Sequence, residues 1–186
     1  MGTQYTKVAS DEVIGTTVEA LKRNGFTVTV VEDAAEAKEA VLGRIPKGSE
    51  VFTNTSVTLD KTGIAAVINE GSDYVSARNT MMALYGDPKK KKEMKQVAGT
   101  PEFAIGSAHA ITQDGKILVA SASGSQFPAE AYGSENVIFV VGAQKLVKDL
   151  AEGVKRIEEH SVLLEQERAM AAYGMNSLCQ AARAPA

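Results

Sequence analysis

The sequence has a single cysteine, Cys179, among its 186 residues. One thiol cannot form an internal disulfide, hold an iron–sulfur cluster alone or build a zinc site from cysteines. Such low cysteine usage is typical of proteins that work in the reducing cytoplasm. We therefore predict a cytoplasmic protein that has neither a metal site nor a cofactor of its own.

Long apolar segments are also missing. No apolar run approaches the ~20 residues that span a bilayer, and the N-terminal stretch MGTQYTKVASDE has no apolar core of a secretory signal. The net charge is −3 and no segment forms a strongly basic face. We therefore expect a soluble protein that binds neither membranes nor nucleic acid.

Several catalytic motifs are absent as well. There is no GxGxxG after an expected strand, no GxxxxGK[ST] loop and no GxSxG elbow, which argues against dinucleotide-binding proteins, P-loop enzymes and α/β-hydrolases. No cluster of His, Cys and Asp has metal-ligand spacing, and no pair of carboxylates is placed for acid–base chemistry. His109, just after an expected strand end, is a weak catalytic candidate. A satisfied, half-buried histidine is the simpler interpretation of the same residue.

Strand-like and helix-like segments alternate along the chain, which predicts an α/β fold with a mostly parallel sheet. Hydrophobic residues make up 44% and charged residues 23%, close to the globular average. We expect one three-layer domain with helices on both faces of the sheet, over residues 11–173. Residues 1–10 would form an N-terminal arm and residues 174–186 a mobile tail.

The strands are expected where β-branched and apolar residues run together. Val137–Val141 is apolar throughout, as in a central strand buried on both faces. Gln113-Asp114-Gly115 predicts a hairpin turn between Phe103–Ile105 and Lys116–Ala120. The remaining expected strands are Phe26–Val31, Glu50–Thr53 and Asp73–Val75.

The expected helices are marked by caps and by a 3.6-residue apolar period. Asp33 is a predicted N-cap, and Asp87-Pro88 is a predicted helix start. Lys89–Lys92 then forms either a solvated face, which we favour, or a contact for an anionic molecule. The expected helices cover Asp11–Asn24, Asp33–Arg44, Ser56 or Thr58 to Glu70, Asn79–Tyr85, Leu146–Glu159 and Leu163–Tyr173. His160 is expected to mark the end of the helix Leu146–Glu159.

Three polar loops follow expected strands, and each has two interpretations. Thr53–Thr58 (TNTSVT) offers four small polar residues where simple helix capping needs one. Ser121–Gln126 (SASGSQ) combines serines with a glycine, and is either a flexible loop or a ligand loop. Gly142–Lys145 (GAQK) ends on a lysine at an expected helix start, an unfavourable place unless an anion lies nearby. The predicted ligand-binding residues are Asn54, Thr55, Ser56, Thr58, Ser107, Ser121, Ser123, Gly124, Ser125, Gln126, Gly142, Gln144 and Lys145.

In this order, the segments EVFTNTSVTLDKTGI, FAIGSAHAITQDGKILVASASGSQFPAEAYG and VIFVVGAQKLVKDL resemble the lactate-utilisation (LUD) domain family. The resemblance covers roughly Asp11 to Tyr173. It implies a fold similar to ribose-5-phosphate isomerase and the CoA transferases, whose strand-end loops bind phosphorylated sugars, CoA or related anions. It also implies a role in oxidising lactate to pyruvate beside separate iron–sulfur partner proteins. The catalytic glutamate of CoA transferases has no equivalent that we can place here.

Three functions follow from these observations. The first is a subunit or accessory factor in the oxidation of lactate to pyruvate, which binds a small organic acid or phosphate-bearing anion. The second is a stand-alone isomerase or transferase acting on a phosphorylated or CoA-linked substrate. The third is a ligand-binding regulatory protein without chemistry. The lack of a clear nucleophile argues against the second, and the polar loops argue against a pure scaffold.

Overall fold

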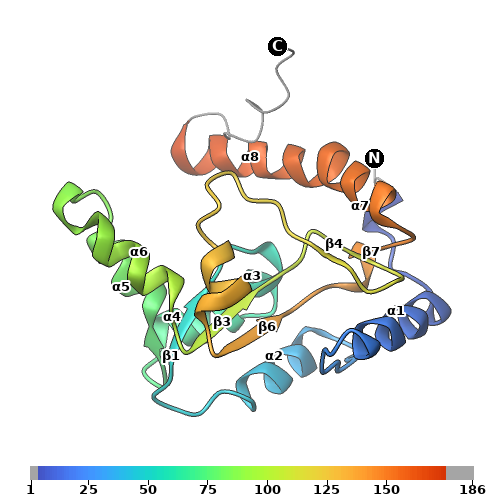
Figure 1. The fold of residues 1–186 in the computed structure, drawn as a ribbon, viewed down its shortest axis with the longest axis horizontal. Coiled ribbons are helices and arrows are strands. Elements are labelled where there is room, and N and C mark those ends of the chain that lie inside the picture. The colour runs from blue at the N-terminus through green and yellow to red at the C-terminus, as the bar shows by residue number, and fades with distance from the viewer. Residues whose placement is uncertain (1–3, 175–186) are drawn as a thin grey trace. The chain divides into compact units, whose positions relative to one another are not determined.

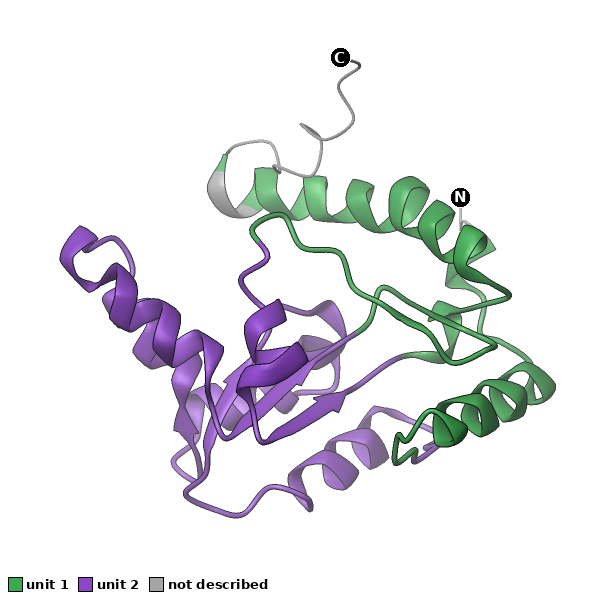
Figure 2. Cartoon of the chain, viewed as in Figure 1, with its two compact units in different colours: residues 1–28, 108–123, 142–186 green, residues 29–107, 124–141 purple. Residues whose placement is uncertain are grey.

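The computed structural model describes residues 4–174, and within it the chain forms two compact units (Figure 2). Unit 1 comprises the described residues of Met1–Val28, Ala108–Ser123 and Gly142–Ala186. Unit 2 comprises Thr29–Ser107 and Gly124–Val141. Each unit is therefore assembled from segments that are separated in the sequence. The expected tail, from residue 175 on, lies outside the described residues.

Unit 2 contains a four-stranded parallel sheet (Figure 1). Its order is β2 (Val75–Ser76), β1 (Glu50–Thr53), β3 (Phe103–Gly106) and β6 (Asn136–Phe139). All three pairings are parallel, so the carboxyl ends of the strands lie along one edge of the sheet. The α/β class and the mostly parallel sheet were both predicted from the sequence and are confirmed.

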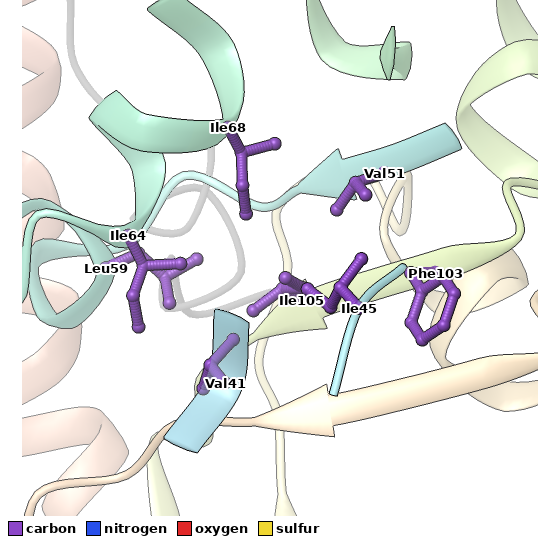
Figure 3. Close-up of a cluster of buried hydrophobic side chains, with 8 residues drawn as sticks. All are labelled: Val41, Ile45, Val51, Leu59, Ile64, Ile68, Phe103 and Ile105. Atoms are coloured by element: carbon purple, nitrogen blue, oxygen red, sulfur yellow. The ribbon is translucent and has the colours of Figure 1, made fainter. Parts of the chain in front are cut away.

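Helices cover both faces of this sheet. On one face, α2 (Ala34–Leu42), α3 (Val57–Lys61) and α4 (Ile64–Glu70) supply a core with Val51 of β1 (Figure 3). Side chains alternate along a strand, so Phe52 faces the other side, where it packs against Ala77 and Ala98. Those residues belong to α5 (Ala77–Leu84) and α6 (Lys91–Gly99), which follows the 3₁₀ turn η2 (Pro88–Lys90).

Local signals account for several element boundaries. Asp33 accepts hydrogen bonds from the backbone N–H groups of Ala35 and Glu36, which confirms the predicted N-cap. Asp87 likewise accepts from Lys89 N. The helix expected from Ser56 to Glu70 is divided into α3 and α4, because Gly63 adopts a left-handed conformation with φ +71° that favours glycine.

Unit 1 contains a small mixed sheet with the order β5 (Ile117–Leu118), β4 (Ala110–Thr112) and β7 (Leu146–Val147). Helix α7 (Leu150–Arg156) contacts β4 and β7, and a Cβ atom added at Gly153 would lie 2.7 Å from Leu118. The π-helical turn η5 (Ile157–Ser161) continues α7 into α8 (Val162–Tyr173). Helix α1 (Asp11–Arg23) precedes Asn24, which donates hydrogen bonds to the carbonyls of Asp114 and Gly115.

The strand expected at Phe26–Val31 is wrong, since this segment is irregular in the structure. Its β-branched residues favour extended backbone, but strand formation also needs a partner strand and burial. Phe26 is 43% exposed and Val30 is 56% exposed. The segment also contains the boundary between the two units, after Val28.

The central, doubly buried strand expected at Val137–Val141 is also wrong. Strand β6 stands at the end of the sheet order and pairs only with β3. Val137 is 36% exposed, and the strand ends at Phe139. A continuous apolar run is compatible with an outer strand, which is why its composition misled the prediction.

Three further expectations need correction. The turn Gln113-Asp114-Gly115 does form a hairpin, but it joins β5 to β4 and not to Phe103–Ile105. The helix expected from Leu146 begins only at Leu150, because Leu146 and Val147 pair with β4. His160 lies inside the helical run from α7 to α8 and does not end a helix. None of the helices between residues 4 and 174 is long and apolar enough to cross a membrane.

Candidate functional site

The predicted ligand-binding residues divide between the two units. Unit 2 holds Asn54–Thr58, Ser107 and Gly124–Gln126, whereas unit 1 holds His109, Ser121, Ser123, Gly142, Gln144 and Lys145. The three polar loops are therefore not all in one unit. Within each unit, however, the structure brings some of these residues together with others that the sequence did not indicate.

In unit 2, the loop Asn54–Thr58 lies at the carboxyl end of β1. The backbone N–H of Asn54 donates to the carbonyl of Ile105 at 2.9 Å, so the loop begins beside the end of β3. Ser56 is the N-cap of α3, as the simpler interpretation of the sequence required. The hydroxyls of Ser107 and Thr58 are 3.5 Å apart. Loop residues from two neighbouring strands thus meet at one sheet edge.

Arg78, in the first turn of α5, reaches this loop and was not singled out from the sequence. Its Nη1 donates to the Thr53 carbonyl at 3.1 Å, and its Nη2 donates to the Thr55 hydroxyl at 3.0 Å. A guanidinium carries five N–H donors. It therefore places a permanent positive charge with further donor capacity beside the loop.

Glu130 is a second residue that the sequence did not indicate. It lies in a π-helical turn, η3 (Ala129–Gly133), and its Oε1 accepts a hydrogen bond of 2.5 Å from Asn54 Nδ2. Burial raises the pKa of Glu130 to about 7, although the Asn54 hydrogen bond acts in the opposite direction. The carboxyl therefore exchanges its proton near neutral pH, as acid–base groups in functional sites do.

The approach of Glu130 to the sheet depends on Gly106 at the end of β3. A Cβ atom at this position would lie 2.7 Å from Glu130 Oε1 and 2.8 Å from Asn54 Nδ2. Any larger residue would push the two side chains away from the strand. The loop Gly124–Gln126 joins the same region, because the Gln126 carbonyl accepts from Glu130 N at 3.1 Å.

In unit 1, three basic residues, His109, Lys145 and Arg156, form what we call the basic cluster. Arg156 is only 3% exposed, and its Nη1 donates to the His109 carbonyl and to the Ser161 hydroxyl. The Cζ atom of Arg156 lies 5.9 Å from the centre of the Tyr5 ring. Among the described residues, its buried Nε has no hydrogen-bond partner. A buried guanidinium with an unused donor is suited to an anion.

Burial and neighbouring positive charge disfavour the charged forms of His109 and Lys145 in the basic cluster. Burial, and after it the charges of Lys145 and Arg156, lower the pKa of His109 to about 4 against the opposing effect of Glu165. Burial, followed by Arg156, lowers the pKa of Lys145 to about 8. His109 Nδ1 accepts a hydrogen bond from Ala120 N at 3.2 Å, as a neutral imidazole does.

A family model of the LUD domain matches residues 14–176. The chain belongs to the LUD domain family. The family assignment made from the sequence motifs is thereby confirmed, and it relates the chain to lactate utilisation. No curated protein and no solved structure shows significant similarity to the chain, so the likeness to ribose-5-phosphate isomerase and the CoA transferases stays a prediction.

Lys145 was predicted as a ligand-binding residue because it was expected at a helix start, and that expectation is wrong. It does not begin a helix, since it ends the 3₁₀ turn η4 (Ala143–Lys145), and α7 is capped by Asp149 four positions later. The macrodipole of α7 therefore gives no argument for an anion at Lys145. Its place in the basic cluster supplies a different one.

Other groups in the LUD domain contribute less to a site. Within residues 4–174, no group of three or more His, Cys, Asp or Glu side chains is arranged to hold a metal ion. The run Lys89–Lys92 is exposed, as the favoured interpretation expected. Lys92 and Lys95 line a hollow with Tyr132 between α6 and η3.

Proposed function

We propose that this LUD-domain protein binds a small organic anion at its basic cluster, and that it acts as a subunit or accessory factor in the oxidation of lactate to pyruvate. The observation that carries the proposal is the gathering of His109, Lys145 and Arg156 in one partly buried place. The family membership supports the lactate-related context.

The physical argument rests on the cost of burying positive groups close to one another. Positive groups that lower one another's pKa are destabilised in their charged forms, and a bound carboxylate or phosphate removes part of that cost. Arg156 and Lys145 would provide the charge, while neutral His109 would donate from Nε2. Binding an anion should therefore raise the pKa values of His109 and Lys145 by reciprocal linkage.

The test is calorimetric titration of the purified protein with lactate, pyruvate and inorganic phosphate at pH 7. We expect at least one of the three to bind, and replacement of Lys145 by Ala to weaken that binding at least tenfold. Lys148→Ala is the matched control, since Lys148 is an exposed lysine of the same unit. Equal binding by the wild type and Lys145→Ala would remove the basic cluster from consideration.

We also propose iron–sulfur proteins of a lactate-oxidising system in the cytoplasm as partners, on the ground of the chain's membership of the LUD domain family. Affinity purification of the full chain from its native cells should recover such proteins. Recovery of the chain alone at native expression levels would favour the regulatory alternative, in which ligand binding occurs without a redox partner.

A further inference from the structure

Unit 2 contains a polar pair that the basic cluster does not use, Asn54 and Glu130. The pair lies where β1 and β3 end, on the face of the sheet that α5 and α6 cover. In open parallel sheets, ligands sit outside the carboxyl ends of the strands. The position of the pair is therefore the expected one for a ligand in this unit, independently of any property of unit 1.

We propose that Asn54 and protonated Glu130 bind the carboxylate of a small organic acid, each donating one hydrogen bond to it. The Asn54 carboxamide has two N–H donors, of which one serves Glu130 Oε1. A protonated carboxyl adds an O–H donor next to the remaining N–H. Two adjacent donors match the two oxygens of one carboxylate, as a guanidinium fork does.

The surroundings of the pair fit an anionic ligand. Arg78 donates hydrogen bonds to Thr53 and Thr55 of the same loop and adds positive charge there. Glycine at position 106 lets both side chains lie close against the end of β3, where a larger residue would displace them. A π-helical turn places Glu130, and such turns occur frequently at functional sites.

The protonation of Glu130 has an identifiable origin. Helix α6 and strand β3 pack against η3. The charged residues of α6 are Lys91, Lys92, Glu93 and Lys95, of which Lys92 and Lys95 line the hollow beside Tyr132. Glu102, before β3, accepts hydrogen bonds from the Ser49 hydroxyl and from Glu50 N. Burial nevertheless dominates, and it holds the pKa of Glu130 at about 7. At this pH, ligand binding would draw about half a proton from solution.

The test uses pyruvate as the probe and Lys145→Ala as the background, so that the basic cluster does not contribute. Titration in two buffers of different ionisation enthalpy should reveal proton uptake of about one half at pH 7. The affinity should fall about tenfold between pH 6 and pH 8, since protonated Glu130 decreases from about nine-tenths to about one-tenth. Methyl pyruvate, which has no carboxylate, should not bind.

Variants separate the proposed role from a structural one. Glu130→Gln keeps the shape and a donor but has no proton to lose, so pyruvate should still bind, without the pH dependence. Asn54→Ala should weaken binding at least tenfold at pH 6. Glu135→Gln, at an exposed glutamate after the same turn, should change neither property. Melting curves of each variant establish that it is folded.

Two outcomes would overturn the proposal. One is an absence of pyruvate binding to folded Lys145→Ala protein at pH 6, and the other is an unchanged pH profile in Glu130→Gln. Neither depends on the proposed function, which fails separately if Lys145→Ala binds lactate, pyruvate and phosphate as the wild type does. If the wild type and Lys145→Ala bind pyruvate equally and Asn54→Ala does not bind it, only the proposed site in unit 2 is supported.

Discussion

Replacing Glu130 by Gln should stabilise the protein above neutral pH and leave it unchanged in acid. In the folded state burial holds the Glu130 pKa at about 7, whereas in the unfolded chain it returns to 4.5. The folded state therefore binds more protons between these values, and the free energy of unfolding falls as the pH rises from about 4.5 to about 7. Above pH 7 both states are ionised and the loss is constant.

The size of the effect follows from the difference between the two pKa values. That difference corresponds to about 3 kcal/mol, and partial exposure of Glu130 to solvent reduces it to about 1–2 kcal/mol. The variant keeps the Asn54 hydrogen bond, because the Gln side chain also offers an Oε1 acceptor. In a domain of this length 1–2 kcal/mol raises the melting temperature by roughly 2–8 °C.

The assay is urea unfolding of the wild type and Glu130→Gln at pH 4.5 and pH 8, followed by far-UV circular dichroism. We expect the midpoint of the variant to exceed that of the wild type only at pH 8, with similar slopes. Glu135→Gln, at an exposed position, serves as the control. Equal midpoints at pH 8 would mean that Glu130 is not held above its ordinary pKa, and the account of the pair would fail.

Two other residues lead to direct predictions. His109 has its pKa lowered to about 4 by burial and by the charges of Lys145 and Arg156, so the folded protein should lose stability as the pH falls from 6.5 toward 4; His109→Gln should flatten this part of the stability curve in urea unfolding. Leu59 is fully buried in the core of unit 2, so Leu59→Ala should lower the free energy of unfolding by about 3 kcal/mol. Guanidinium unfolding would measure this loss, and a loss below about 1 kcal/mol would contradict the prediction.

The sequence was sufficient where structure is determined by neighbouring residues. The caps at Asp33 and Ser56 act within three positions. Asp33 was predicted, and Ser56 was one of two predicted alternatives, the other being Thr58. Strand β1 was predicted with its bounds, because Val51, Phe52 and Thr53 have high strand propensity and turn signals lie on either side. The order of helices and strands then implied a mostly parallel sheet, which the structure confirms.

The residues that complete the two candidate sites act over long distances in the chain. Glu130 is 76 positions from Asn54, and Arg156 is 47 positions from His109. Neither has a local pattern that distinguishes it from an ordinary surface residue. The same limit explains the error at Phe26–Val31, since the presence of a partner strand is a property of the fold and not of the segment.

Both proposed sites respond to pH in the same direction, although they use different chemistry. Lys145, with a pKa of about 8, and Glu130, with a pKa of about 7, gain protons as the pH falls through neutrality. Protonation makes Lys145 a cation and Glu130 a neutral donor, and each form favours a bound carboxylate. Occupancy by an organic acid should therefore increase as the pH falls from 8 to 6. By reciprocity, the bound acid should raise both pKa values, so that the protein takes up protons together with its ligand.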